Sequence, residues 1–165
     1  MVLQNTETKD LLEAVIESVD ENDFKQIRKN KIQFKWFNWT RVKTRELYKL
    51  CLKDTNMILG LMCILEHTNP AIDAIEIELL EVGDENVGSK KKLSNIAGCL
   101  IAFACRESFR RGHEGWMFLT PKTELIMHYT SLYGLKYVPP IGGKLVGMML
   151  AEPQVSHRLI RRYLD

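Results

Sequence analysis

The sequence lacks any long uninterrupted hydrophobic run. Its longest apolar stretches, MILGLMCIL at 57–65 and IAGCLIAFAC at 96–105, are much shorter than the roughly 18 to 20 residues that a membrane-spanning helix requires. The acidic, amphipathic N-terminal segment has no basic part followed by an apolar one, so no secretory signal is readable in it. We therefore expect a cytoplasmic protein with no membrane partner.

The sequence also lacks a strong charge of either sign. The net charge is +2, and the basic residues are spread out except at 90–92 and near the C-terminus, which does not favour a nucleic-acid partner. Four cysteines form no C-x-x-C pair and have apolar neighbours, where a reduced thiol behaves as a small hydrophobe. No histidine pair has metal-ligand spacing. We expect buried free thiols and no metal site.

The sequence does contain enough apolar residues to form one hydrophobic core. With 165 residues, of which 45% are hydrophobic, it is too short for two comfortable domains, so we expect a single domain over 1–165. Leu11, Leu12, Val15, Ile16 and Val19 follow helical spacing and predict an amphipathic helix over 8–19. The expected parts are an N-terminal helical region at about 1–40, a core at about 46–150 and a C-terminal helix at about 153–164.

The core shows a clear order of predicted elements. Runs at 46–53, 57–67 and 71–82 have strand character and are separated by short turns, which predicts an antiparallel meander. A loop and a buried helix from Ile96 follow, and the next predicted elements are a strand at 116–120, a helix at 121–134 and strands on both sides of the turn PPIGG. This order predicts an α/β protein with a mixed, mostly antiparallel central sheet flanked by helices.

The loop before the buried helix reads VGDENVGSKKKLSNIAG over 82–98. Its first half differs from the phosphate-loop pattern G-x-x-x-x-G-K-[ST] in that Ser89, and not lysine, follows Gly88. The apolar helix begins only at Ile96, and the strands before the loop are predicted to be antiparallel, whereas phosphate-loop folds need parallel strand-helix-strand units. A phosphate loop of that type is therefore disfavoured.

The second half of the loop, KLSNIAG at 92–98, resembles the acyl-CoA pyrophosphate loop of the GNAT-type N-acetyltransferase superfamily, [RQ]-x-x-G-x-[GA]. Lys92 takes the Arg/Gln place, Asn95 the first glycine place and Ala97 the last small place. Lysine keeps the positive charge, and asparagine tolerates positive φ better than other residues except glycine. The order of elements over 46–150 also resembles that superfamily, and the helix after the fifth strand supplies Tyr129 followed by Gly134.

This resemblance implies a GNAT-type acyltransferase fold, acetyl-CoA as co-substrate and transfer of an acetyl group to a primary amine by direct attack. The loop turns N–H groups inward at the positive end of a helix dipole, which suits a diphosphate. The acyl-CoA-binding residues that the resemblance implies are Val82, Lys92, Leu93, Ser94, Asn95, Ile96, Ala97, Gly98 and Lys122.

The resemblance also implies catalytic residues. A primary amine is protonated at neutral pH, with a reference pKa near 10.4, so a base must remove a proton. The superfamily often places a glutamate on the fourth strand, and Glu78 and Glu81 are the two candidates; strand alternation puts Glu76 with Glu78 and Glu81 on the other face. Tyr129 is the candidate acid for the leaving thiolate, with Tyr133 as the second choice.

Two other function classes stay open from the sequence. One is a non-catalytic GNAT-like module that binds acyl-CoA or a protein. The other is a nucleic-acid binder that uses the basic and aromatic segment 24–39, although a packed helix end and connector explains that segment more simply. The expected partner is a small-molecule or protein amine, and the final hairpin or the C-terminal helix could pair two copies in a homodimer. No motif identifies the acceptor.

Overall fold

The structure, a computed structural model, describes residues 1–143 and 146–165. These residues divide into two compact units: unit 1 contains Met1–Cys63 and Leu79–Leu100, and unit 2 contains Ile64–Glu78 and Ile101–Asp165. Strands β4 (Ile58–Asn69) and β5 (Ile72–Val82) and helix α2 (Ile96–Arg110) have residues in both units. The expectation of one domain over 1–165 stays a prediction.

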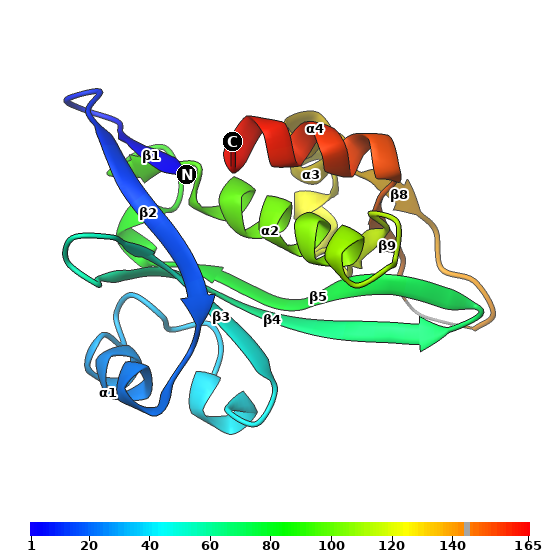
Figure 1. The fold of residues 1–165 in the computed structure, drawn as a ribbon, viewed down its shortest axis with the longest axis horizontal. Coiled ribbons are helices and arrows are strands. Elements are labelled where there is room, and N and C mark those ends of the chain that lie inside the picture. Colours follow the sequence, from blue (N-terminus) through cyan, green and yellow to red (C-terminus); the bar gives the residue numbers. More distant parts are fainter. Residues whose placement is uncertain (144–145) are drawn as a thin grey trace. The chain divides into compact units, whose positions relative to one another are not determined.

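Unit 1 contains the strands β1, β2, β3 and β6 and parts of β4 and β5 (Figure 1). Its strand order is β6-β1-β2-β3-β4-β5, in which β1 pairs antiparallel with β2 and β6, and β2 pairs antiparallel with β3. Its elements besides parts of β4, β5 and α2 are β1 (Val2–Asn5), β2 (Leu11–Ser18), α1 (Glu21–Lys29), η1 (Trp39–Val42), β3 (Glu46–Leu52), η2 (Asp84–Asn86) and β6 (Leu93–Ser94).

The predicted helix over 8–19 is wrong, because this segment forms strand β2. Burial alternates along it: Leu12, Ala14 and Ile16 turn inward, whereas Glu13 and Glu17 are exposed. Neighbouring apolar residues such as Leu11 and Leu12 fit the spacing of a helix as well as that of a strand. Hydrogen bonding to β1 and β3 makes the segment a strand. The N-terminal region of about 1–40 is therefore strand, strand and helix.

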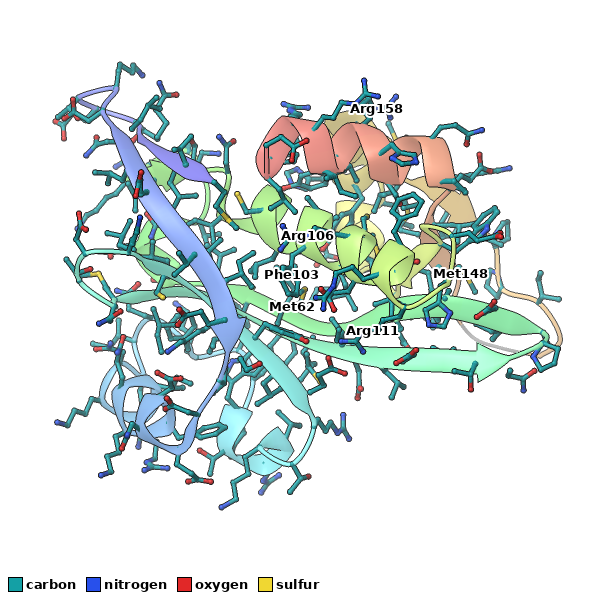
Figure 2. The ribbon with its side chains drawn as sticks, in the orientation of Figure 1. Met62, Phe103, Arg106, Arg111, Met148 and Arg158 are labelled. Atoms are coloured by element: carbon teal, nitrogen blue, oxygen red, sulfur yellow. The ribbon has the colours of Figure 1, made fainter. Side chains whose placement is uncertain are left out.

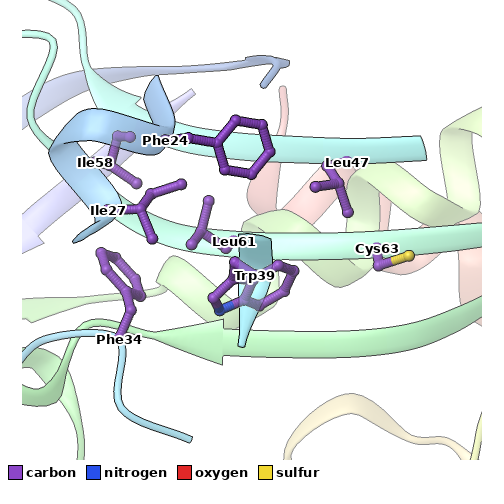
Figure 3. Close-up of a cluster of buried hydrophobic side chains, with 8 residues drawn as sticks. All are labelled: Phe24, Ile27, Phe34, Trp39, Leu47, Ile58, Leu61 and Cys63. Carbon is purple, nitrogen blue, oxygen red and sulfur yellow. The ribbon is translucent and has the colours of Figure 1, made fainter. Parts of the chain in front are cut away.

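The core of unit 1 forms where α1 and the segment after it pack against the strands. Asp20 caps α1 by accepting from the Asp23 N–H at 2.9 Å, and Asp23 accepts from the Asp20 N–H at 2.8 Å. A cluster of buried side chains then joins this region to β3 and β4 (Figure 3): Phe24, Ile27, Phe34, Trp39, Leu47, Ile58, Leu61 and Cys63. The packed helix end and connector predicted for 24–39 is confirmed, with Trp36 left exposed.

Unit 2 has the strand order β4-β5-β7-β9-β8. The pair of β5 with β7 is parallel, with Ile75 opposite Met117, and β9 pairs antiparallel with β7 and with β8. The predicted order of strands and helices is confirmed here, but the helix predicted over 121–134 begins only at Ile126, after a short 3₁₀ turn. The strand predicted over 144–150 begins only at Met148, and residues 144–145 of that prediction lie outside the described residues. The elements are β7 (Met117–Leu119), η3 (Thr123–Leu125), α3 (Ile126–Tyr133), β8 (Lys136–Val138), β9 (Met148–Ala151) and α4 (Pro153–Tyr163).

Helix α4 packs beside the C-terminal half of α2 (Figure 1). The rings of Phe109 and His157 stack with centroids 4.3 Å apart, and the buried Ser156 hydroxyl donates to the Gly115 carbonyl at 2.5 Å. Side chains from both helices fill the space between them (Figure 2). Among the described residues, no helix combines the length and the apolar character needed to cross a membrane.

Candidate active site

The loop that precedes α2 is held at both ends by unit 1. Strand β6 pairs with β1, which places Ser94 opposite Gln4, and the Thr6 N–H donates to the Lys92 carbonyl at 2.9 Å. On the other side, the Leu93 N–H donates to the side chain of buried Asn86 at 2.8 Å. These bonds order the loop before any ligand is present.

The loop turns into α2 at Asn95, which has φ +74°. This is the left-handed region, where glycine and asparagine are the residues most readily accommodated. The Asn95 carbonyl accepts from the Cys99 N–H at 2.9 Å, so α2 starts directly after Asn95. The N–H groups of Ile96, Ala97 and Gly98 therefore lie in the first turn, where a helix has no internal acceptors for them.

Gly60 on β4 allows the start of α2 to approach the strands closely. A Cβ at this position would lie 2.8 Å from Ile96 Cγ2 and 3.0 Å from Leu100 Cδ1. The nearest strand neighbour is the carbonyl of Glu81, at 3.6 Å. The first turn of α2 is thus seated directly on β4 and β5 within unit 1.

Positive charge near this helix start is partly compensated. Lys92 forms an ion pair with Glu85 at 2.9 Å, whereas the side chains of Lys90 and Lys91 are exposed. Lys35 pairs with Asp84 at 3.0 Å at the beginning of the same loop. The N–H groups, the helix dipole and three consecutive lysines are a donor set that fits a diphosphate.

Glu81 is deeply buried, with only 3% of its surface exposed. One carboxylate oxygen accepts from the Trp36 N–H and the other from the Trp39 indole N–H, both at 2.8 Å. Both oxygens are therefore engaged by unit 1. This environment suits a residue that positions the segment 36–39 against the strands.

The other glutamates of β5 have different surroundings in unit 2. Glu78, the second candidate base, is half-buried near the division between the units. Glu76 pairs with the Nε2 of His67 at 2.8 Å, and both side chains line a cavity beside Phe118. Neither His67 nor Glu76 was among the predicted catalytic residues. The turn at 70–71 between β4 and β5 brings His67 within diagonal reach of Glu76, so a predicted hairpin here was the signal that could have identified the pair.

Tyr129 lies on α3 and is half-buried. Burial raises the pKa of its phenol, which keeps the hydroxyl protonated and able to donate at neutral pH. Its ring is 6.1 Å from that of buried Tyr133, which is in turn 6.1 Å from the ring of Tyr163. Lys122, exposed before η3, belongs to the same unit.

The predicted residues therefore divide into two groups. Glu81 and the whole loop set from Val82 to Gly98 belong to unit 1, whereas Glu78, Lys122 and Tyr129 belong to unit 2. Within unit 1, the backbone of Glu81 and the first turn of α2 approach each other at Gly60. The structure does not test the roles assigned to these residues, which stay predictions.

The cysteines show no nucleophile. All four are buried free thiols, as expected from their neighbours: Cys51, Cys63, Cys99 and Cys105. Burial raises the pKa of Cys99 to about 11 and that of Cys105 to about 12, so both thiols are protonated at neutral pH. Over residues 1–143 and 146–165, no group of three His, Cys, Asp or Glu side chains is placed to hold a metal ion.

No family model and no curated protein sequence matches this chain. Solved structures do: an acetyltransferase of the GNAT family from Listeria monocytogenes has a TM-score of 0.63, with 14% identity over 86% of this chain and 95% of that one. A Bacillus subtilis acetyltransferase in complex with CoA has a TM-score of 0.57, with 13% identity over 85% and 99% of the two chains. The structure of AtaTR bound with acetyl-CoA has a TM-score of 0.55, with 13% identity over 90% and 98%.

These likenesses agree with the strand order and with the position of the loop before α2. They cover most of this chain and nearly all of each solved structure. At such low identity they show the architecture alone. The chain therefore has the GNAT-type acyltransferase fold that the residues at 92–98 and the order of elements had predicted.

Proposed function

We propose that this chain is an acetyl-CoA-dependent N-acetyltransferase that moves an acetyl group to a primary amine by direct attack. The observation that carries the proposal is the start of α2, where Asn95 has φ +74° directly before the helix, in a loop that resembles an acyl-CoA pyrophosphate loop. Support comes from the fold, which is shared with a protein bound to CoA and with one bound to acetyl-CoA.

In this proposal the loop holds the diphosphate of acetyl-CoA. The N–H groups of Ile96, Ala97 and Gly98 donate at the positive end of the α2 dipole. Lys90 and Lys91 add positive charge, and Lys92 does so when the phosphate replaces Glu85 as its partner. Acetyl-CoA supplies a thioester whose carbonyl carbon accepts a nucleophile.

The proposed reaction needs two proton transfers. The ammonium form of the acceptor gives one proton to a base; the neutral nitrogen then forms a C–N bond with the acetyl carbon, and the C–S bond breaks. The second proton leaves the nitrogen and ends on the departing sulfur, through the Tyr129 hydroxyl, whose raised pKa keeps it protonated. Of the two predicted bases, Glu78 and Glu81, Glu81 has both carboxylate oxygens engaged by hydrogen bonds, which disfavours it as the base.

Calorimetric titration of acetyl-CoA into the whole protein tests the phosphate site. We expect micromolar binding and a loss of about tenfold or more in affinity for Lys92→Glu, because the substitution reverses a charge at the diphosphate. Lys25→Glu is the matched control: Lys25 is exposed on α1, and its reversal should leave affinity unchanged. Dephosphorylated CoA, which keeps the diphosphate but lacks the ribose phosphate, separates the contributions of the two phosphate groups.

Release of free CoA thiol in the presence of primary amines tests the transfer itself. Tyr129→Phe should lower kcat by about 10² or more with little change in acetyl-CoA affinity, because it removes a proton donor and keeps the ring. Tight acetyl-CoA binding without thiol release for any amine would overturn the transfer and support the non-catalytic alternative. Absence of binding at millimolar acetyl-CoA would overturn the whole proposal.

A further inference from the structure

Unit 2 contains a cavity of about 620 Å³, a size that suits a small organic ligand. Its lining is mostly apolar, with side chains from β5 and β7 and from the segments around β8 and β9, including Met148 (Figure 2). The apolar lining side chains that decide the argument are Ile72, Phe118, Val138, Pro140, Ile141 and Met148. Such a lining favours an apolar ligand body.

Two ionisable side chains interrupt this apolar lining. His67 Nε2 and Glu76 Oε2 are 2.8 Å apart, and the His67 ring lies against the Phe118 ring with centroids 5.4 Å apart. In the part of the chain that the structure describes, neither His67 Nδ1 nor Glu76 Oε1 has a hydrogen-bond partner. Every fully buried polar side-chain atom there does have a partner, so these two atoms are exposed to solvent. These two atoms are therefore accessible to a ligand in the cavity.

The geometry of the pair determines its chemistry. In the tautomer that donates from Nε2 to Glu76, the other ring nitrogen of His67, Nδ1, carries a lone pair. An ammonium group has several N–H donors, so it can donate to Nδ1 and to Glu76 Oε1 together. Among the described lining residues only His67 and Glu76 are ionisable, and burying a second, unpaired charge beside them would be costly.

We infer that this cavity binds the acceptor of the reaction, a primary amine carried on an apolar aromatic or alkyl body, and that His67 receives the proton of its ammonium group. This inference rests on the proposed acetyl transfer. Glu76 holds His67 and binds the ammonium, and the proton moves from the nitrogen to Nδ1. The neutral nitrogen then attacks the acetyl carbon, the C–S bond breaks, and the sulfur takes the remaining proton.

A second histidine of unit 2, the buried His113, shows why His67 is the one assigned. His113 is 4% exposed, and its Nε2 pairs with Glu66 at 2.7 Å while its Nδ1 pairs with Asp73. Both ring nitrogens are engaged, so His113 has no lone pair for a substrate. His67 keeps one nitrogen for the cavity.

The first test measures amine binding to the whole protein without acetyl-CoA, by calorimetry at pH 7.5. We expect 2-phenylethylamine to bind at least about tenfold more tightly than 2-phenylethanol, which lacks the ammonium, and than spermidine, which has no apolar body. Glu76→Gln should weaken 2-phenylethylamine binding by about tenfold or more. Glu124→Gln is the matched control, since Glu124 is exposed on η3 and does not line the cavity.

The second test separates proton transfer from binding, with 2-phenylethylamine and acetyl-CoA as substrates. His67→Gln should lower kcat by about 10² with little change in the KM for the amine, whereas the control His157→Gln should keep kcat. His157 is exposed on α4 and stacks on Phe109, outside the cavity.

Equal binding of the amine and the alcohol, or unchanged amine binding in Glu76→Gln, would overturn the cavity as an ammonium site. A full kcat in His67→Gln would overturn the role of His67. Because the first test omits acetyl-CoA, its result is independent of the proposed function: amine binding without any acetyl-CoA binding would support the ammonium site while the acetyl transfer fails.

Discussion

Two glutamates of the same strand, Glu81 and Glu76, have opposite surroundings. Glu81 is buried in unit 1, where a backbone N–H and an indole N–H occupy both of its oxygens. Glu76 in unit 2 uses one oxygen for His67 and leaves the other accessible in a cavity. The difference shows how the role of a carboxylate on this strand depends on its hydrogen bonds. A carboxylate whose two oxygens both accept from the protein stabilises the fold, whereas one with an unused oxygen can bind a ligand.

Two of the histidines of unit 2, His113 and His67, repeat this contrast. His113 lies between Glu66 and Asp73 and uses both ring nitrogens, and Arg111 (Figure 2) extends the network by pairing with Glu66 at 3.2 Å. His67 has a single carboxylate partner. A satisfied polar network joins the β4–β5 hairpin to the α2–β7 loop, whereas the incompletely satisfied pair faces the cavity.

The largest expected effect comes from replacing Glu81, whose two carboxylate oxygens both accept hydrogen bonds. Glu81→Leu should lower the free energy of unfolding by about 3 kcal/mol, because it leaves two N–H donors buried without acceptors. Glu76→Leu should change the free energy of unfolding by less than about 1 kcal/mol, since water in the cavity can hydrogen-bond to His67 in place of the carboxylate. Urea unfolding followed by tryptophan fluorescence measures both. Similar losses for the two variants would contradict the comparison.

An intermediate effect is expected at His113. Burial alone would lower the pKa of His113, but the bonds with Glu66 and Asp73 outweigh it and raise the pKa above the usual 6.5. The imidazolium contribution to stability is therefore complete below pH 6.5 and is lost as pH rises through the raised pKa. His113→Gln should lower the free energy of unfolding by roughly 1 to 2 kcal/mol at pH 6 and by less at alkaline pH.

The measurement is a series of urea unfolding curves from pH 5.5 to 9 on the wild type and on His113→Gln. The same series on His67→Gln is the comparison, because His67 has one partner and a side chain that is 26% exposed. A loss in His113→Gln that stays constant over this pH range would contradict the role of the imidazolium.

The smallest effect is expected at the ion pair of the loop. Glu85 holds Lys92 at 2.9 Å, with the lysine side chain 70% exposed, so the pair is weak. Glu85→Gln should tighten acetyl-CoA binding about two- to threefold, because Lys92 no longer exchanges a carboxylate for a phosphate. Calorimetry at low salt measures it, and Glu7→Gln, on an exposed turn, is the control. Weaker binding in Glu85→Gln would show that Glu85 orders the loop.

The core elements and the loop could be predicted because their signals are local. Asn95 marks a backbone position with positive φ, and the small Ala97 and Gly98 follow it into a long apolar helix. Turns predicted at 54–56 and 68–70 mark the breaks between β3, β4 and β5, which the structure places at 53–57 and 70–71. The helix predicted over 8–19 failed because its apolar spacing suits both structures, and only pairing with β1 and β3 makes it a strand.

The candidate site was harder to predict from the sequence. Glu78 and Glu81 were selected by their place on a strand, but the contacts of Glu81 with Trp36 and Trp39 join residues that are distant in the chain. The pair of His67 and Glu76 depends on the register of a hairpin and on the apolar side chains that surround it. Neither feature leaves a pattern in a short stretch of sequence.

The sequence by itself determined the strand and helix order of the core, the positive-φ residue before α2 and the burial of the four cysteines, because each depends on neighbours in the chain. Tertiary structure decided that 11–18 is a strand, that Glu81 is saturated and that His67 keeps a nitrogen accessible. The physical reason is that hydrogen-bond satisfaction and burial depend on which distant segments pack together, and those contacts form only in the folded chain.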